Sequence, residues 1–473
     1  MKDYAIVGSG IGGSSIAALL NAKGFDVALF EKEPYLGGCS STFTHKGHKY
    51  NTGATTLAGY EEGHTVKEIF DEIGVKPNLI ETDPSIVIMQ NKKTTPRYKN
   101  FDAFFEVVNR NYPHQNNENF WKLVYEINKD FYTMKEYYYS NESAFKKVRS
   151  LLSFFPLFLK FSKYLRVNAL SFTKELMPDL GEEYLDFLEA QIYIVAQAPM
   201  KEINFLTAAL SLAYTFSKNH YVLGGFGTLF DELTKDIKDV HKNAEILQIV
   251  QLQEHFELHT KKEIFKARKV ILNSTVYDSA KLFKHSNIKK YYKKYERLNN
   301  HQSSFMLYMT IKSDKEFLHH YQLIQNSRLK NTISKAIFVS FSDASDAAIT
   351  KEGHYSITAS IHTDSGFWEN QENYKAQKKE LQELIQEIIM KSLDIKEEEI
   401  VQAFSATSKT FEHYIKRSQL GGNAMSMKNL LPFLPGNDTP IKNLYNVGDS
   451  VYAAQGWPGV MLGVKNLKRL LDV

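Results

Sequence analysis

Apolar and polar positions in the first thirty residues predict a strand, a helix and a second strand. Residues 4–7 form a short continuous apolar run, as expected for a buried strand, and residues 25–30 form another. Between them, residues 14–22 are small and mostly apolar, which favours a closely packed helix, and Gly24 stands where that helix would end. The pattern therefore predicts a β–α–β unit at the start of the chain.

The middle and later parts of the chain carry two other patterns. Residues 100–215 show helical spacing, contain few glycines and are rich in tyrosine and phenylalanine. Strand-like runs at 304–311, 336–341 and 355–361 are bounded by polar turns and predict a sheet. Residues 374–393 predict an amphipathic helix with a charged outer face that covers this sheet.

Composition narrows the function classes. Apolar residues make up 43% and charged residues 24% of the 473 residues, which excludes a wholly disordered or collagen-like chain. The net charge of +4 is too small to indicate a nucleic-acid partner. A single cysteine, Cys39, excludes an intrachain disulfide, and no histidine pair has metal-site spacing on a predicted helix, so we expect no metal.

The apolar segments also bear on location. Residues 4–20 are interrupted by glycines and serines, which suits neither a signal peptide nor a membrane-spanning helix. We therefore expect a cytoplasmic protein, soluble or peripheral on the inner face of the cell membrane. Residues 146–166 interleave bulky apolar residues with bases, and Pro156 is expected to start or break a helix there. This segment is typical either of peripheral contact with a membrane or of a helix pair packed in the core.

A glycine-rich turn follows the first predicted strand. Residues 8–13 read G-S-G-I-G-G, in which Gly8 suits the tight turn, Gly10 lets the backbone approach a pyrophosphate, and Gly13 lets helix and strand pack closely. The following helix would direct its N-terminus at the phosphates. Glu31 ends the second strand, where a carboxylate can accept ribose hydroxyls. Together these features predict dinucleotide binding.

Two further segments indicate which dinucleotide is bound. A second glycine pair lies in residues 37–41 (G-G-C-S-S), and residues 443–450 read as a strand that runs into a Gly-Asp turn. Residues 455–463 (Q-G-W-P-G-V-M-L-G) then open a last helix. In this arrangement the chain resembles FAD enzymes of the amine oxidase superfamily. With residues 47–55 (G-H-K-Y-N-T-G-A-T), it is most similar to the phytoene desaturase, carotenoid isomerase and retinol saturase family, although Asn51 stands where an acid is usual.

The resemblance implies FAD as the cofactor and a set of residues around it. Asp449 would contact the ribityl-phosphate region, the amides of Val460 and Met461 would face the flavin, and Val250 would lie beside the adenine. Trp457 and Val460 are the candidates for lining the reaction site, and no catalytic side chain is assigned. The residues expected to bind the cofactor are Gly8, Gly10, Gly12, Gly13, Glu31, Lys32, Gly38, Cys39, Ser40, Val250, Gly448, Asp449, Gly459, Val460 and Met461.

The resemblance also implies the fold and its division along the chain. We expect an α/β protein, α+β overall, with a Rossmann-type FAD-binding domain and an inserted substrate domain of a mixed sheet plus helices. The FAD-binding domain is expected to be discontinuous, from residues 1–75, 218–292 and 415–473. Residues 76–217 would form a helical region that faces the substrate or a membrane, and residues 293–414 the substrate-domain sheet with its cover helices.

The function implied is that of an FAD-dependent oxidoreductase acting on a long apolar polyene or isoprenoid. Hydride transfer at flavin N5 would serve carotenoid-type desaturation, isomerisation or saturation. A flavin amine oxidase is an alternative, but Val460 stands where such enzymes have an aromatic residue and Leu462 where an acid is common. A non-enzymatic prenyl-lipid carrier of the same fold is a further alternative, and the intact glycine motif argues against it.

Overall fold

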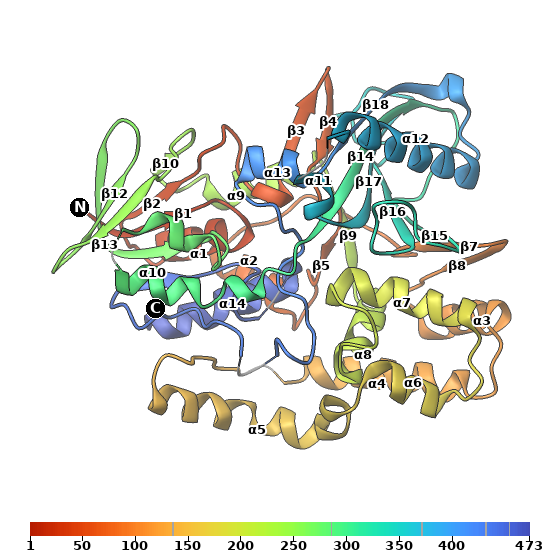
Figure 1. The fold of residues 1–473 in the computed structure, drawn as a ribbon, viewed down its shortest axis with the longest axis horizontal. Coiled ribbons are helices and arrows are strands. Elements are labelled where there is room, and N and C mark those ends of the chain that lie inside the picture. Colours follow the sequence, from red (N-terminus) through yellow and green to blue (C-terminus); the bar gives the residue numbers. More distant parts are fainter. Residues whose placement is uncertain (135–136, 285, 370–371, 431–432, 454) are drawn as a thin grey trace.

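The computed structural model describes residues 1–134, 137–284, 286–369, 372–430, 433–453 and 455–473. Figure 1 shows three parts: one sheet with its helices on the left, a second sheet at the upper right, and a group of helices along the lower edge. The predicted α/β fold, with a Rossmann-type unit and an additional mixed sheet plus helices, is confirmed.

The first sheet contains the β–α–β unit predicted at the N-terminus. Its central strands are parallel, and Tyr4 in β1 pairs with Val27 in β2 on one side and with Lys269 in β13 on the other. Parallel pairing requires a crossover, which α1 (Ile11–Ala22) supplies between β1 and β2. The strand order is β10 (Asp239–His241), β2 (Val27–Phe30), β1 (Lys2–Val7), β13 (Ile264–Leu272), β12 (Phe256–His259), β11 (Gln248–Gln251), and β19 (Leu444–Asn446) also pairs with β13.

Helices cover both faces of the first sheet. On one face, α1 packs against helices that come from distant parts of the chain, namely α2 (Thr65–Ile73), α9 (Gly227–Thr234) and α14 (Gly456–Leu471). On the other face, α10 (Ser286–Lys293) packs Ile288 and Tyr292 against Ala5 and Phe30. Burial on both faces explains why β2 is a continuous apolar run.

The second sheet is mostly antiparallel and has two different faces. One face carries the apolar cluster that packs against α12 (Tyr374–Leu393), the predicted cover helix. The opposite face faces a large cavity. The strand order is β18 (Ile400–Ala406), β14 (Gln302–Lys312), β17 (His354–Asp364), β16 (Ala336–Phe341), β15 (His320–Ile324), β7 (Val87–Gln90), β8 (Lys93–Pro96).

The helical group lies between the two sheets and the lower edge of the molecule in Figure 1. Its centre is α8 (Phe205–Ala213), a helix of small and apolar residues that contacts four of the other helices. The remaining helices are α3 (Phe101–Asn111), α4 (Asn117–Tyr132), α5 (Ala144–Arg166), α6 (Ala169–Leu176) and α7 (Glu182–Ala196). No helix in the described part of the chain is long and apolar enough to cross a membrane.

Short elements connect these parts. A hairpin of β3 (Thr42–His45) and β4 (His48–Asn51) lies beside β17, and α11 (Gly366–Glu369) packs against α13 (Ser408–Ile415). A small sheet is formed by β5 (Leu57–Ala58), β9 (Asn219–Val222) and β6 (Leu79–Glu81).

The structure corrects the expectation that Pro156 starts or breaks a helix. Helix α5 runs through Pro156 without interruption for 23 residues. A proline inside a helix removes the hydrogen bond to the carbonyl four residues earlier, here that of Leu152. Leu152 is 69% exposed, so water can hydrate that carbonyl in place of the missing donor.

Candidate functional site

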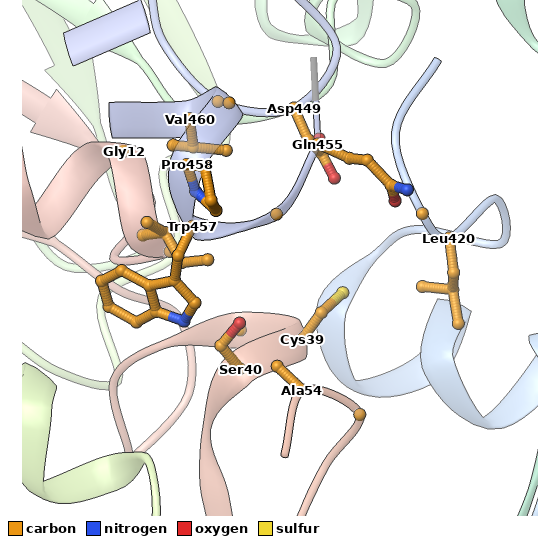
Figure 2. A pocket seen from close by; sticks show the side chains of 18 of the residues that line it. Gly12, Cys39, Ser40, Ala54, Leu420, Asp449, Gln455, Trp457, Pro458 and Val460 are labelled. Atoms are coloured by element: carbon orange, nitrogen blue, oxygen red, sulfur yellow. The ribbon is translucent and has the colours of Figure 1, made fainter. Parts of the chain in front are cut away.

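A cavity of about 1040 Å³ lies where the first sheet, the second sheet and the helical group meet. Its lining runs from the glycine-rich turn after β1 to the aromatic residues at the end of α4. Figure 2 shows part of the lining, in which Gly12, Cys39, Ser40 and Asp449 come from segments far apart in the sequence. The volume is slightly above the usual range for small-molecule pockets, about 300–1,000 Å³.

The glycine-rich turn at the carboxyl end of β1 leaves no room for larger side chains. A Cβ atom on Gly13 would lie 2.0 Å from the carbonyl oxygen of Gly8, so α1 and β1 touch through their backbones. A Cβ on Gly10 would lie 2.6 Å from Nδ2 of Asn273. Gly8 adopts a φ of +99°, which favours glycine. The bare backbone at the start of α1 thus forms one end of the cavity, which we call the glycine-rich end.

Glu31 lies at the end of β2, beside this turn. Its Oε2 accepts hydrogen bonds from the backbone N–H of Ser9, at 3.1 Å, and from the Ser9 hydroxyl, at 2.5 Å. Its Oε1 accepts from the N–H of Glu33 at 3.0 Å. Glu31 is only 9% exposed, and these bonds hold the buried carboxylate at the cavity surface. The ammonium group of the next residue, Lys32, donates hydrogen bonds to the carboxylate of Glu33 and to the backbone carbonyl of Tyr414.

An ion pair closes the other side of the glycine-rich end. Asp449, after β19, accepts a hydrogen bond from Arg417 at 2.7 Å, and both side chains are mostly buried. Burial disfavours the charge of Arg417, but the carboxylate of Asp449 outweighs that effect and raises the pKa of Arg417. Between this pair and the glycine-rich turn lies Asn273, which fills the space beside Gly8, Gly10, Gly12 and Gly448.

The middle of the cavity is bounded by the second glycine pair and the start of α14. Cys39, Ser40 and Ala54 lie on one side in Figure 2, and Trp457, Pro458 and Val460 on the other. The indole of Trp457 points into the apolar core, where its centroid lies 5.9 Å from those of Phe70 and Phe230. Burial raises the pKa of the Cys39 thiol, which therefore stays protonated. Helix α14 directs its N-terminus, from Gly456, into the same space.

The far end of the cavity is aromatic and apolar. It is lined by Phe131 and Tyr132 of α4, by Met134 and Tyr137 after it, and by Leu210 of α8. We call these five residues the aromatic end. Two of them contact α5. The ring of Tyr137 stacks on that of Phe154 with centroids 5.1 Å apart, and the ring centroid of Phe131 lies 6.5 Å from that of Phe161.

The second sheet contributes a polar wall to the same cavity. Nε2 of His320 lies 2.9 Å from the hydroxyl of Thr55, which lies 2.8 Å from the hydroxyl of Ser340. Burial, assisted by the neighbouring His319, lowers the pKa of His320 well below its usual value. Burial also lowers the pKa of His362, to about 4. Both imidazoles are therefore neutral near pH 7.

Most of the residues expected around the cofactor gather on this one cavity. Three of them do not line it: Gly13 packs against Gly8, Met461 is buried in the core, and Val250 lies in β11, away from the cavity. The nearby residues 244–247 do line the cavity. The N–H of Ala244 donates a hydrogen bond to the carbonyl of Glu31, which holds this loop at the end of β2. The predicted residues that line the cavity are Gly8, Gly10, Gly12, Glu31, Lys32, Gly38, Cys39, Ser40, Gly448, Asp449, Trp457, Gly459 and Val460.

Other cavity residues were not identified from the sequence. Arg417 pairs with Asp449 across 32 positions, and Asn273 directly follows β13, so neither residue carries a local signal of its role. Alternating positions in the strand-like run at 355–361 do place Thr358 and Ser360 on one face, and this alternation could have pointed to a polar wall.

Comparisons with known proteins agree with this geometry. Residues 6–73 match the model of the NAD(P)-binding Rossmann-like domain. The chain is 26% identical to prolycopene isomerase of Daucus carota, over 99% of this chain and 82% of that protein. The chain is a homologue of the prolycopene isomerases. An all-trans-retinol 13,14-reductase of Homo sapiens is 25% identical over 47% of this chain and 36% of its own length.

The predicted resemblance to the phytoene desaturase, carotenoid isomerase and retinol saturase family is thus confirmed. So is the prediction that the chain is an enzyme of this oxidoreductase and isomerase class. Among solved structures, an oxidoreductase from Methanosarcina mazei has the same fold, with a TM-score of 0.67 at 17% identity over 99% of this chain and 100% of its own.

Proposed function

We propose that this homologue of the prolycopene isomerases is an FAD-dependent oxidoreductase that acts on a long apolar polyene or isoprenoid. The observation that carries the proposal is the continuity of one cavity from the glycine-rich end to the aromatic end. A dinucleotide suits the first end and an apolar chain suits the second, so their reacting parts would meet between Cys39 and Val460. When bound there, FAD would supply hydride transfer for desaturation, isomerisation or saturation.

The residues at the glycine-rich end fit a dinucleotide. Gly10 and Gly12 have no side chain, and a Cβ at either position would come within 3.0 Å of Asn273. The backbone N–H groups at the start of α1 are therefore accessible to a phosphate at the glycine-rich end of the cavity. Glu31 offers a buried carboxylate to ribose hydroxyls. Asp449 and Arg417, held together, would stand beside the phosphate or ribityl part. We infer that these residues bind and orient the cofactor.

The test uses the purified protein and its absorbance spectrum. We expect bound FAD, released on denaturation. Under anaerobic conditions a long polyene in detergent micelles should bleach the oxidised flavin band if it is desaturated and restore the band of chemically reduced protein if it is saturated, whereas isomerisation should change only the spectrum of the polyene. Primary amines and polyamines, added separately, should leave the spectrum unchanged, because Val460 and Leu462 give this cavity apolar surface at the positions where amine oxidases differ. Bleaching by amines alone would refute the substrate class, and protein that binds no FAD would refute the whole proposal.

We further propose that α5 contacts the surface of a lipid bilayer. Along one side of this helix, large apolar side chains are exposed: Phe145 (79%), Val148 (55%), Leu152 (69%), Phe155 (56%) and Leu159 (66%). The helix carries six lysines and arginines and no acidic residue, which suits anionic headgroups. Its buried side contacts Phe131 and Tyr137, so a bilayer at the exposed side would lie one helix away from the aromatic end.

Vesicle flotation tests this contact. We expect the protein to float with phosphatidylcholine vesicles that contain phosphatidylglycerol, and a variant with Leu152→Glu and Phe155→Glu to stay in solution with its flavin content unchanged. The control is Leu318→Glu with Val401→Glu, at two exposed apolar residues of the second-sheet region. Wild-type protein that does not float with these vesicles, or a control that also stays in solution, would contradict the role of α5.

A further inference from the structure

The cavity-facing side of the second sheet is unusually rich in hydroxyls and imidazoles. In an antiparallel sheet, side chains alternate between the two faces, and here the apolar set, including Leu307, Ile337 and Ile361, packs under α12. The other set would normally face solvent, but in this protein it faces the cavity. The polar residues of these strands that line the cavity are Ser304, His320, Ser340, Thr358, Ser360 and His362.

Three of these side chains form a group without hydrogen-bond partners. Ser304 in β14 lies directly opposite His362 in β17, and Ser360 is two residues before His362 on the same face. In the described part of the chain, no group hydrogen-bonds to the side chains of these three residues. His362 is nevertheless only 8% exposed, and its ring contacts that of Tyr193. We call Ser304, Ser360 and His362 the hydroxyl wall.

The other three polar residues of these strands that line the cavity already have hydrogen-bond partners within the protein. His320 and Ser340 are bonded to Thr55, and the hydroxyl of Thr358 donates to the carbonyl of Asn51 at 3.3 Å. The hydroxyl wall is therefore the part of the sheet that is left for a ligand. Buried polar groups in proteins are nearly always hydrogen-bonded, so unpaired ones beside a cavity point to a ligand or to water.

A wholly apolar substrate would be a poor match for this wall. A hydrocarbon pressed against it would displace water from two hydroxyls and an imidazole and return no hydrogen bond, which costs free energy for each stranded group. Serine hydroxyls donate and accept, and a neutral imidazole donates from one nitrogen and accepts at the other. The wall can therefore serve either an alcohol or a carbonyl oxygen, and it needs no charge on the ligand.

We propose that the hydroxyl wall binds an oxygen atom of the substrate, so that the preferred substrate is a long apolar chain bearing a hydroxyl or carbonyl group. The inference rests on the proposed function for the apolar chain and adds to it the polar group. It makes Ser304, Ser360 and His362 specificity-determining residues. They are not assigned a part in bond making or breaking.

The test compares two ligands that differ in one group: an isoprenoid alcohol such as geranylgeraniol and the hydrocarbon that lacks only its hydroxyl. Each is titrated against the protein in the same detergent, and the ratio of the two dissociation constants is measured. We expect the alcohol to bind about tenfold more tightly than the hydrocarbon, a difference of about 1.4 kcal/mol. His362→Phe and Ser360→Ala should bring the ratio close to one, because they weaken alcohol binding and remove the cost of leaving these polar groups unpaired beside the hydrocarbon.

The control is Met306→Leu, because Met306 lines the cavity on the same face of β14 and carries no hydrogen-bonding group of comparable strength. It should keep the tenfold preference, and melting temperatures would confirm that all variants are folded. Equal affinity of the wild type for both ligands, or variants that lose both ligands in the same proportion, would overturn the inference. Flavin content is measured in the same samples. Protein that holds FAD but shows no preference overturns this inference alone, whereas flavin-free protein with the preference overturns the proposed function and leaves this inference standing.

Discussion

The contact between Gly13 and Gly8 allows a prediction whose size follows from the structure. A Cβ atom on Gly13 would lie 2.0 Å from the Gly8 carbonyl oxygen, whereas real Cβ contacts are essentially never under 3.0 Å. Gly13→Ala must therefore move α1 and β1 apart by at least 3.0 − 2.0 = 1.0 Å. Both groups are backbone in a buried region, so no side chain can swing aside.

The expected loss of stability is the difference between two effects. Forced overpacking of a core costs about 3 kcal/mol at the upper end of its usual range. An alanine inside a helix returns about 1 kcal/mol relative to glycine. We therefore expect Gly13→Ala to lower the free energy of unfolding by about 2 kcal/mol or more, measured by urea denaturation, and to reduce the bound cofactor.

A matched control is Gly181→Ala, because a Cβ on Gly181 meets no atom within 4 Å and its φ of −66° suits any residue. It should change the free energy of unfolding by no more than about 1 kcal/mol, the usual cost of alanine at a helix N-cap. If Gly13→Ala unfolds at the same urea concentration as the wild type and keeps its cofactor, the close approach of α1 and β1 is not what this glycine provides.

Three other predictions concern the charged and titratable groups of the cavity. Asp449→Asn should lower the free energy of unfolding by about 2–3 kcal/mol in urea denaturation, because it leaves the Arg417 cation without its partner. This loss is smaller than that expected for a fully buried ion pair, since both side chains keep some exposure. Adding Arg417→Met to it should recover most of the loss, and failure to do so would mean that the pair is not coupled. Glu31→Gln should give folded protein with little FAD by absorbance, and full flavin occupancy would contradict its assigned role. The pKa of His362 is about 4 in the folded protein and about 6.5 in an unfolded chain, so between these pH values only the unfolded state binds the proton. Stability should therefore fall as the pH drops through this window, by up to about 3 kcal/mol, and His362→Phe should remove that part of the slope.

Local patterns in the sequence were sufficient for several elements. The strand, glycine turn and helix at the N-terminus depend on residues next to one another, and α12 has the bounds expected for the cover helix, 374–393. The strand-like runs at 304–311 and 355–361 became β14 and β17, each longer by several residues. In such segments periodicity and turn residues determine the element directly.

Features that depend on distant residues could not be predicted in this way. Strand β7 joins the second sheet by pairing Met89 with Leu323, and its sequence gives no sign of that partner. Strand β15 begins with polar residues and has no clear alternation, so only its neighbours in the sheet identify it as a strand. Arg417 is buried next to Asp449 because two loops converge there, and Pro156 is tolerated because Leu152 lies at the surface. Each outcome depends on the assembled fold.

The distribution of charge around the cavity helps to explain why the sequence offered no acid–base pair. Six of the charged residues in the lining form ion pairs with one another: Arg417 with Asp449, Lys465 with Glu68 at 2.7 Å, and Lys281 with Asp278 at 2.8 Å.

The hydroxyl wall is different, because its groups are neutral and have no hydrogen-bond partner in the described part of the chain. Neutral groups cost much less to bury than charges, so such a wall can bind the oxygen atom of a ligand inside an otherwise apolar cavity. It follows that the preference for an oxygen-bearing ligand should be constant near neutral pH and should change only as the pH approaches about 4, where His362 of the folded protein takes up a proton.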